Sequence, residues 1–100
     1  MRTINGKFFW GNDPQEPHSY DYECEVNGDG WNPTVECNID GIPAQDYVEE
    51  GGDILSTGYS TGPDGEPILM GFEFKSRLHA NASEIQFRDE IEEVMEELLE

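Results

Sequence analysis

The segments SYDYECEV (residues 19–26) and TVECNID (residues 34–40) alternate between apolar and polar side chains. Successive side chains of a strand point to opposite faces of a sheet, so each segment is predicted to be a strand with one apolar face. The intervening NGDGWNP is rich in residues that favour turns, which predicts a β-hairpin with a long loop. The register that brings the apolar faces together pairs Val26 with Val35, Cys24 with Cys37 and Tyr22 with Ile39.

Cys24 and Cys37, the two cysteines of the chain, become direct cross-strand neighbours in this register. The Cβ atoms of such neighbours lie about 4.5–5.5 Å apart, whereas a disulfide prefers a Cβ separation of about 3.5–4.5 Å. The cysteines also lack a CxxC spacing and the density of a secreted disulfide scaffold. We therefore expect buried, reduced thiols that pack as small apolar side chains.

Short strands and turns also occupy the remainder of residues 1–80. A strand is predicted at residues 7–10, extending back to residue 3, and a second hairpin at residues 54–60 and 68–75 around the turn TGPDGEP. Ile68, Met70, Phe72 and Phe74 alternate along its second strand and form the expected apolar face. Between the hairpins, a proline and a glycine near the ends of residues 43–51 predict a helix of one to two turns.

Residues 83–100 form an uninterrupted charged and aliphatic stretch, which predicts a helix. It begins with the capping box SEIQ, in which the Ser83 hydroxyl accepts a hydrogen bond from the Gln86 amide and the Gln86 side chain returns to Ser83. Apolar residues recur at helical spacing along one stripe, which must pack on the sheet: Phe87, Ile91, Val94, Met95 and Leu98.

Together these elements predict an α+β fold, with an antiparallel sheet of about five strands and a C-terminal amphipathic acidic helix packed on one face. A length of 100 residues predicts a single domain over residues 1–100, mainly β over residues 1–80 and helical over residues 83–100. The sequence has no apolar run typical of a signal peptide or a membrane span. A soluble, cytoplasmic protein is therefore expected.

Charge limits the possible partners. The chain has 5 Lys and Arg residues against 23 Asp and Glu, a formal net charge of −18. Direct binding to nucleic acid or to an anionic membrane surface needs a basic patch, which five scattered cations cannot form. We therefore expect a basic protein as the partner, with no direct contact to nucleic acid or membrane.

Two acidic surfaces are predicted. In the helix, several carboxylates repel one another at i,i+4 spacing, and three lie in the last turn beside the negative end of the helix dipole. Such unfavourable placements without local compensation favour a functional surface, although a solvated face that maintains solubility explains the same residues. The predicted partner-binding residues are Asp89, Glu90, Glu93, Glu96, Glu97 and Glu100 on the helix, and Asp21, Glu23, Glu25, Glu36 and Asp40 on the outer face of the first hairpin.

In size and acidity the chain resembles small protein inhibitors that mimic nucleic acid, such as phage anti-restriction and anti-CRISPR proteins and inhibitors of nucleases. That class shares no fold or motif, so no residue role carries over. The resemblance implies a DNA mimic that inhibits a basic, nucleic-acid-binding protein. The alternatives are a non-enzymatic interaction or assembly protein, homodimeric through leftover apolar helix positions such as Leu99, and a cognate inhibitor of a basic toxin.

The sequence contains no recognised catalytic motif and one weak match to a metal-binding motif. Residues 25–36, EVNGDGWNPTVE, approach the EF-hand pattern, but the preceding segment alternates as a strand and a hairpin turn explains the same residues. Ca²⁺ binding there stays open, and no cofactor is expected. His18 and His79 stand in no catalytic motif, which predicts that the protein is not an enzyme. Phe9 and Trp31 are candidates for exposed aromatic anchors, unless Trp31 folds back over its own loop.

Overall fold

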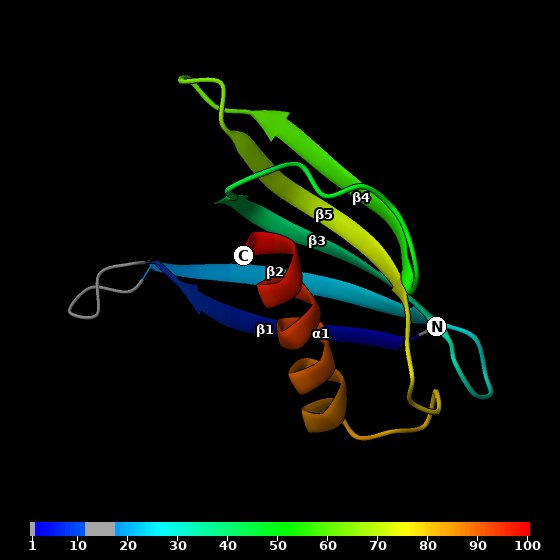
Figure 1. Cartoon of the computed structure of the whole chain (residues 1–100). Coiled ribbons are helices and arrows are strands. Elements are labelled where there is room, and N and C mark those ends of the chain that lie inside the picture. Colours follow the sequence, from blue (N-terminus) through cyan, green and yellow to red (C-terminus); the bar gives the residue numbers. More distant parts are fainter. Residues whose placement is uncertain (1, 12–17) are drawn as a thin grey trace.

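The computed structural model describes residues 2–11 and 18–100. Its strands form one antiparallel sheet in the order β1-β2-β3-β5-β4, and one helix follows them (Figure 1). The elements are β1 (Arg2–Trp10), β2 (His18–Asn27), β3 (Thr34–Pro43), β4 (Ile54–Thr61), β5 (Pro67–Lys75) and α1 (Glu84–Leu99). The predicted α+β fold is confirmed.

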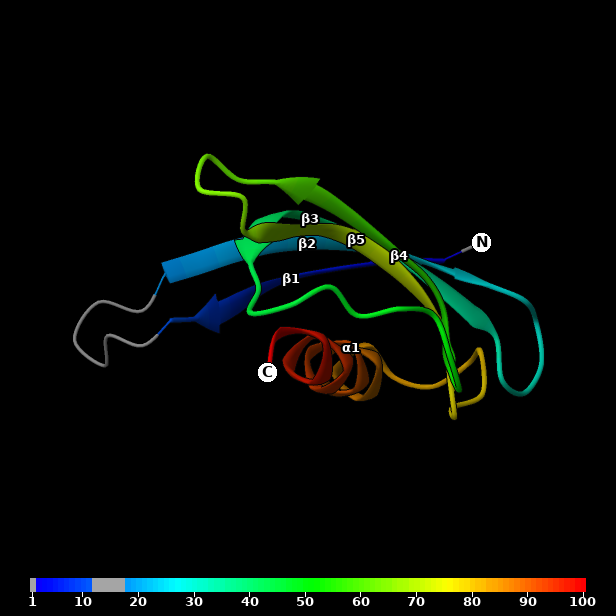
Figure 2. The same cartoon turned by 45° about the horizontal axis from the view of Figure 1, so that its top comes forward.

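The molecule has two layers. Figure 2 shows the curved sheet with α1 against one of its faces, and the connection from β3 to β4 running along the same side. We call this covered side the inner face and the opposite side the outer face. Within the part of the chain that the structure describes, no helix is long and apolar enough to cross a membrane.

The predicted pairing of β2 with β3 is confirmed, with Tyr22 opposite Ile39, Cys24 opposite Cys37 and Val26 opposite Val35. These side chains point to the inner face and belong to the core. Because the period of a strand is two residues, the register also fixes the polar residues of both strands on the outer face.

The expectation of reduced thiols is wrong: Cys24 and Cys37 form a disulfide in the core. The predicted β2–β3 register is correct, but the two cysteines lie closer together than the average cross-strand pair on which the expectation rested. The two Cα atoms lie 4.1 Å apart, so the strands approach closely enough at this pair for the sulfur atoms to bond.

The predicted apolar face of β5 is partly wrong. Leu69, Phe72 and Phe74 are buried, whereas Met70 is 45% exposed. The register of β5 shifts at Met70 against both neighbouring strands. Gly58 and Tyr59 are consecutive in β4 but pair with Gly71 and Leu69, and the β3–β5 register shifts between Asn38 and Ile42. A bulge of this kind moves side chains from one face of a sheet to the other.

No helix forms at residues 43–51. Pro43 ends β3, and residues 44–50 run in an irregular, non-helical conformation along the inner face. The Val48 amide donates to the Tyr59 hydroxyl (3.1 Å), and the Thr57 hydroxyl donates to the Val48 carbonyl (2.9 Å). A single helix leaves β4 uncovered, so this connection extends along the sheet and packs against the side chains of that strand.

α1 has the predicted start and the predicted apolar stripe. Ser83 is the N-cap of a complete capping box with Gln86, and Phe87, Ile91, Met95 and Leu98 are buried against the sheet. Leu99 is also buried, at 1% exposure. Dimerisation through Leu99 therefore has no basis in this structure, because that side chain belongs to the core.

A tyrosine from the sheet helps to position α1. The Tyr22 side chain passes over Gly6 of β1, where a Cβ atom would clash with the Tyr22 ring, and its hydroxyl donates to a Glu92 carboxylate oxygen of α1 (3.0 Å). A glycine in the middle of a strand is explained by this close approach. Burial and the hydrogen bond to the Glu92 carboxylate raise the pKa of Tyr22 well above its ordinary value.

The disulfide predicts a stability difference on reduction. Closing a loop of this size stabilises a protein by about 3 kcal/mol. A reducing agent should therefore lower the free energy of unfolding by about 2–3 kcal/mol, measured by urea titration. Without reductant, the denatured protein should show no free thiols toward a thiol reagent. Detection of both thiols in that sample would contradict the Cys24–Cys37 bond.

The raised pKa of Tyr22 predicts lability in alkali. Above about pH 10 the unfolded state loses this proton while the folded state keeps it, so stability falls as pH rises. Between pH 9 and pH 11, Tyr22 should account for a loss of about 1–1.5 kcal/mol in the free energy of unfolding. The variant Tyr22→Phe should lack this part of the loss, and Tyr20→Phe should retain it. Equal slopes for all three proteins would contradict the assignment.

Candidate functional site

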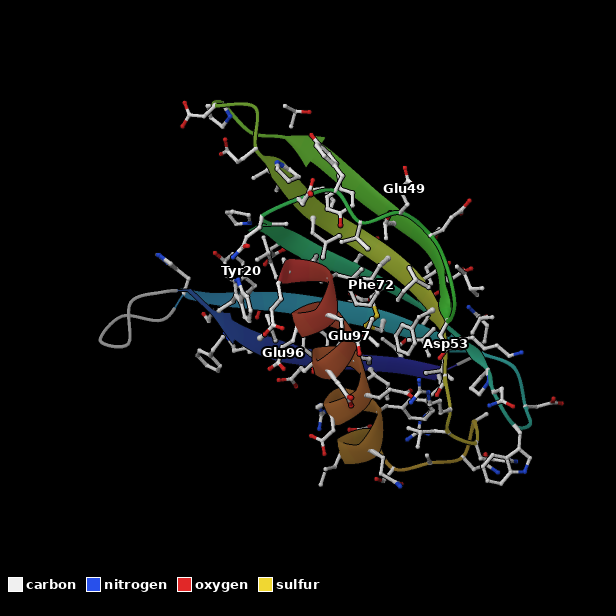
Figure 3. All side chains as sticks on the ribbon, viewed as in Figure 1. Tyr20, Glu49, Asp53, Phe72, Glu96 and Glu97 are labelled. Atoms are coloured by element: carbon white, nitrogen blue, oxygen red, sulfur yellow. A yellow bond between two sulfur atoms is a disulfide. The ribbon has the colours of Figure 1, made fainter. Side chains whose placement is uncertain are left out.

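Apart from Glu84, the exposed carboxylates of α1 and of its C-cap Glu100 form one narrow ridge. Five of them lie within about 100° of arc on the side opposite the buried stripe, because each residue advances the helix by about 100°. We call this set the helix ridge: Asp89, Glu93, Glu96, Glu97 and Glu100. In Figure 3, Glu96 is labelled on the side of α1 toward Tyr20, and Glu97 on the side toward Asp53. The helix ridge therefore presents carboxylates along its crest and both flanks.

Glu90, also predicted as a binding residue, has an internal role. Its carboxylate accepts hydrogen bonds from the Ser76 hydroxyl (2.6 Å) and from the Arg77 backbone amide (2.9 Å). Ser76 is 1% exposed, so Glu90 satisfies a buried hydroxyl and anchors the end of β5 to α1. The structure thus separates Glu90 from the other predicted helix residues.

Two of the five basic side chains make internal contacts, two are paired at the surface, and the fifth, Lys75, lines a hollow beside the helix ridge without forming an ion pair with the ridge. Arg2 donates to the carbonyls of Ala80 and Ala82, and Arg88 contacts Glu84 and the Asn5 carbonyl. On the surface, Lys7 pairs with Asp21 and Arg77 pairs with Asp53. Among the described residues, the five carboxylates of the helix ridge take part in no ion pair or side-chain hydrogen bond.

The outer face of the sheet carries a second acidic surface. Glu25, Glu36 and Glu73 lie side by side on β2, β3 and β5, with Glu25 opposite Glu36 and Glu36 opposite Glu73. Neighbouring strands are about 4.7–4.9 Å apart, so this row brings three carboxylates close together. We call the full set the acidic sheet face: Asp21, Glu23, Glu25, Glu36, Asp40 and Glu73.

Glu73 was missing from the predicted residues. Its position depends on β5 pairing with β3, which lies far from it in the sequence. The sequence pattern predicted two separate hairpins and gave no signal for how they join. Glu73 is also the single carboxylate of the mostly apolar strand PILMGFEFK, so no acidic pattern in the sequence marks it.

The two predicted acidic surfaces do not merge into one site. α1 covers the inner face of the sheet, whereas the acidic sheet face looks away from the helix (Figure 2). A flat partner surface can therefore contact either the helix ridge or the acidic sheet face, and a partner that contacts both must surround the molecule.

A hollow of about 330 Å³ flanks the helix ridge, between α1, the turn at residues 51–54 and the end of β5. Ile54, Phe74 and Val94 provide apolar lining, and Glu93 and Glu97 border the hollow from α1. Lys75 and Arg77 also line it, and Arg77 is paired with Asp53. The hollow combines an apolar surface with two unpaired carboxylates.

The loop between β2 and β3 does not have the geometry of an EF-hand. Glu25 and Glu36 lie on paired strands with their side chains on the outer face. Across residues 2–11 and 18–100, no group of three or more His, Cys, Asp or Glu side chains is arranged to hold a metal ion. His18 begins β2, and His79 pairs with the loop that follows β2, so the two histidines lie at opposite ends of that strand.

Both aromatic candidates are exposed, Phe9 at 61% and Trp31 at 73%. Trp31 does not fold over its own loop. Its ring meets that of His79 edge to face, with the centroids 5.1 Å apart, and the backbones of the two residues form a β-bridge. Trp31 therefore lies at the end of the sheet, on the connection between β5 and α1.

Comparisons with protein-family models, with curated proteins and with solved structures find no match to this chain. The function must therefore be argued from the geometry and charge of these surfaces.

The different environments of Glu90 and Glu93 predict different effects of the same substitution. Glu90→Gln places an amide NH₂ against one of two donors, so we expect the free energy of unfolding to fall by about 1–2 kcal/mol. Glu93→Gln, the matched control on the helix ridge, should change it by less than about 0.5 kcal/mol. Urea titration of both variants measures the difference. Equal stability would show that the Glu90 contacts contribute nothing.

Proposed function

We propose that this protein is a nucleic-acid mimic that binds and inhibits a basic, nucleic-acid-binding protein through the helix ridge. The observation that carries the proposal is the linear spacing of its carboxylates. Residues 89–100 rise about 17 Å along the helix axis, so five carboxylates give one negative charge per about 3–4 Å. One strand of B-DNA carries one phosphate per about 3.4 Å of its axis.

The shape of the whole molecule supports the same proposal. Its Cα extents are 42 × 29 × 18 Å. A net charge of −18 spread over a 42 Å length corresponds to about one charge per 2–3 Å, compared with about one per 1.7 Å for duplex DNA. Acidic residues on both the helix and the outer sheet face give this elongated body negative charge on two opposite sides, as in a duplex.

The hollow beside Glu93 and Glu97 adds a feature that a uniformly charged surface lacks. An arginine or lysine side chain has an aliphatic stem and a cationic head. The stem can pack against Ile54, Phe74 and Val94 while the head meets the two carboxylates. A basic groove that normally holds phosphates supplies such side chains, which favours the helix ridge over the acidic sheet face as the contact surface.

The proposed activity is binding without catalysis, and no cofactor is required for it. The cytoplasmic location and the phage-type anti-defence role stay predictions. The Cys24–Cys37 disulfide counts against a cytoplasmic location, because disulfides persist mainly in oxidising compartments.

Competition with DNA tests the proposal directly. The protein is titrated into complexes of labelled duplex DNA with a histone octamer, a restriction endonuclease and a Cas9-type effector, and release of the DNA is followed by fluorescence anisotropy. We expect displacement from at least one of them, weakening steeply as salt rises from about 50 to about 300 mM. Failure to displace DNA from any of them at low salt would argue against the mimic.

Charge reversal on the helix ridge separates a shaped surface from general acidity. Glu93→Lys/Glu97→Lys should weaken binding by about 10-fold or more, because both side chains border the hollow. Glu49→Lys/Glu50→Lys changes the net charge equally at exposed positions that belong neither to the helix ridge nor to the lining of the hollow, and should weaken binding by less than about 3-fold. Equal losses of affinity in the two double variants would show that binding depends on net charge alone and not on the helix ridge.

A third variant decides between the two acidic surfaces. Glu25→Lys/Glu36→Lys reverses two neighbours on the acidic sheet face. If the helix ridge is the contact surface, this variant should behave like the Glu49/Glu50 control. A loss larger than that of the helix variant would move the contact to the sheet. Thermal melts of all three variants establish that each is folded.

A further inference from the structure

β4 differs from every other strand in its chemistry. Its sequence, ILSTGYST, is the one strand sequence among the described elements without a charged residue, although charged residues make up 28% of the chain. It also lies at the edge of the sheet, with β5 as its only strand neighbour. The strand itself is therefore neutral, while acidic residues flank both of its ends: Glu49, Glu50 and Asp53 before it, and Asp64 and Glu66 after it.

The outer edge of β4 has unused hydrogen-bonding groups. Among the described residues, the backbone of residues 55–61 makes hydrogen bonds only within the ladder with β5. The β3–β4 connection covers the inner face of this strand through contacts of Val48 with Thr57 and Tyr59, but it does not pair with the edge. An open edge of this kind is a template for another strand, and β4 has neither the Lys nor the Pro that commonly protects one.

The opposite edge of the sheet is protected. β1 carries Arg2 and Lys7, and the Arg88 side chain of α1 donates to the Asn5 carbonyl of β1 (2.9 Å). Lys7 is also paired with Asp21. One edge is thus blocked by charges and by a helix side chain, whereas the other is open and its strand carries no charge of its own.

We propose that two copies of this chain pair through β4, forming a continuous sheet across a two-fold axis. A neutral, hydroxyl-rich strand is complementary to itself, as a two-fold interface requires, and it offers no charge that would select the basic partner proposed above. The protected β1 edge closes the assembly at two copies. A contact limited to one strand is small, so the dimer is weak and in rapid exchange.

Salt should have opposite effects on the affinity of dimerisation and on the affinity for the basic partner. Two bodies of charge −18 repel each other, and salt screens that repulsion, so dimerisation strengthens as salt rises. Binding of a basic partner weakens under the same change. The failure of either proposal can therefore be distinguished from the failure of the other.

Sedimentation equilibrium of the full chain tests the pairing. Between about 50 and about 500 mM NaCl we expect the dissociation constant to fall by about 5-fold or more, with no species beyond the dimer. Ser60→Glu adds a carboxylate to the exposed edge strand of an already acidic molecule and should raise the dissociation constant by about 10-fold or more. Ser19→Glu makes the same charge change at an exposed position of β2 and should alter it by less than about 2-fold.

Amide hydrogen exchange locates the contact on the unmodified protein. Exchange in residues 55–61 should slow as protein concentration rises at high salt, while exchange in β1 stays constant. A monomer at every salt concentration, or a dimer that Ser60→Glu leaves unchanged, would overturn the proposal. Species larger than a dimer, or concentration-dependent protection outside β4, would also overturn it.

Discussion

The pairing of β2 with β3 is the constraint on which the other features depend. Aligning the apolar residues of the two strands places the Cys24–Cys37 pair in the core and commits Glu25 and Glu36 to the opposite side. One face of the sheet then needs a cover, and α1 provides most of it (Figure 2). Among residues 2–11 and 18–100 no element covers the outer face, which carries the charged side chains of the strands. The separation of the two acidic surfaces follows from this one register.

Local signals in the sequence were sufficient for much of the fold. The alternation in β2 and β3 predicted their register, and the SEIQ capping box predicted the start of α1. In both cases the signal lies within a few residues of the structure it specifies. The helix ridge was predicted for the same reason, because helical spacing alone determines which carboxylates oppose the apolar stripe.

Features that depend on distant parts of the chain could not be read in this way. Nothing in the sequence of either hairpin predicts that β3 pairs with β5. The exposure of Met70 and the row of carboxylates that includes Glu73 both depend on this pairing. The internal role of Glu90 appears only once Ser76 lies against α1. The disulfide depends on a strand spacing smaller than the average used to judge it, and no pattern of residue types reports such a difference.

The stability of α1 is the sum of favourable contributions from its cap and buried stripe and an unfavourable contribution from repulsion among its carboxylates. Ser83 and the buried stripe favour α1, whereas Glu96, Glu97 and Glu100 repel one another at its negative end. A cationic groove laid along these carboxylates removes that repulsion while leaving every internal contact in place. Any ligand that binds the folded state alone shifts the folding equilibrium toward it. If the proposed basic partner binds along the helix ridge, it therefore also raises the free energy of unfolding of the protein that it binds.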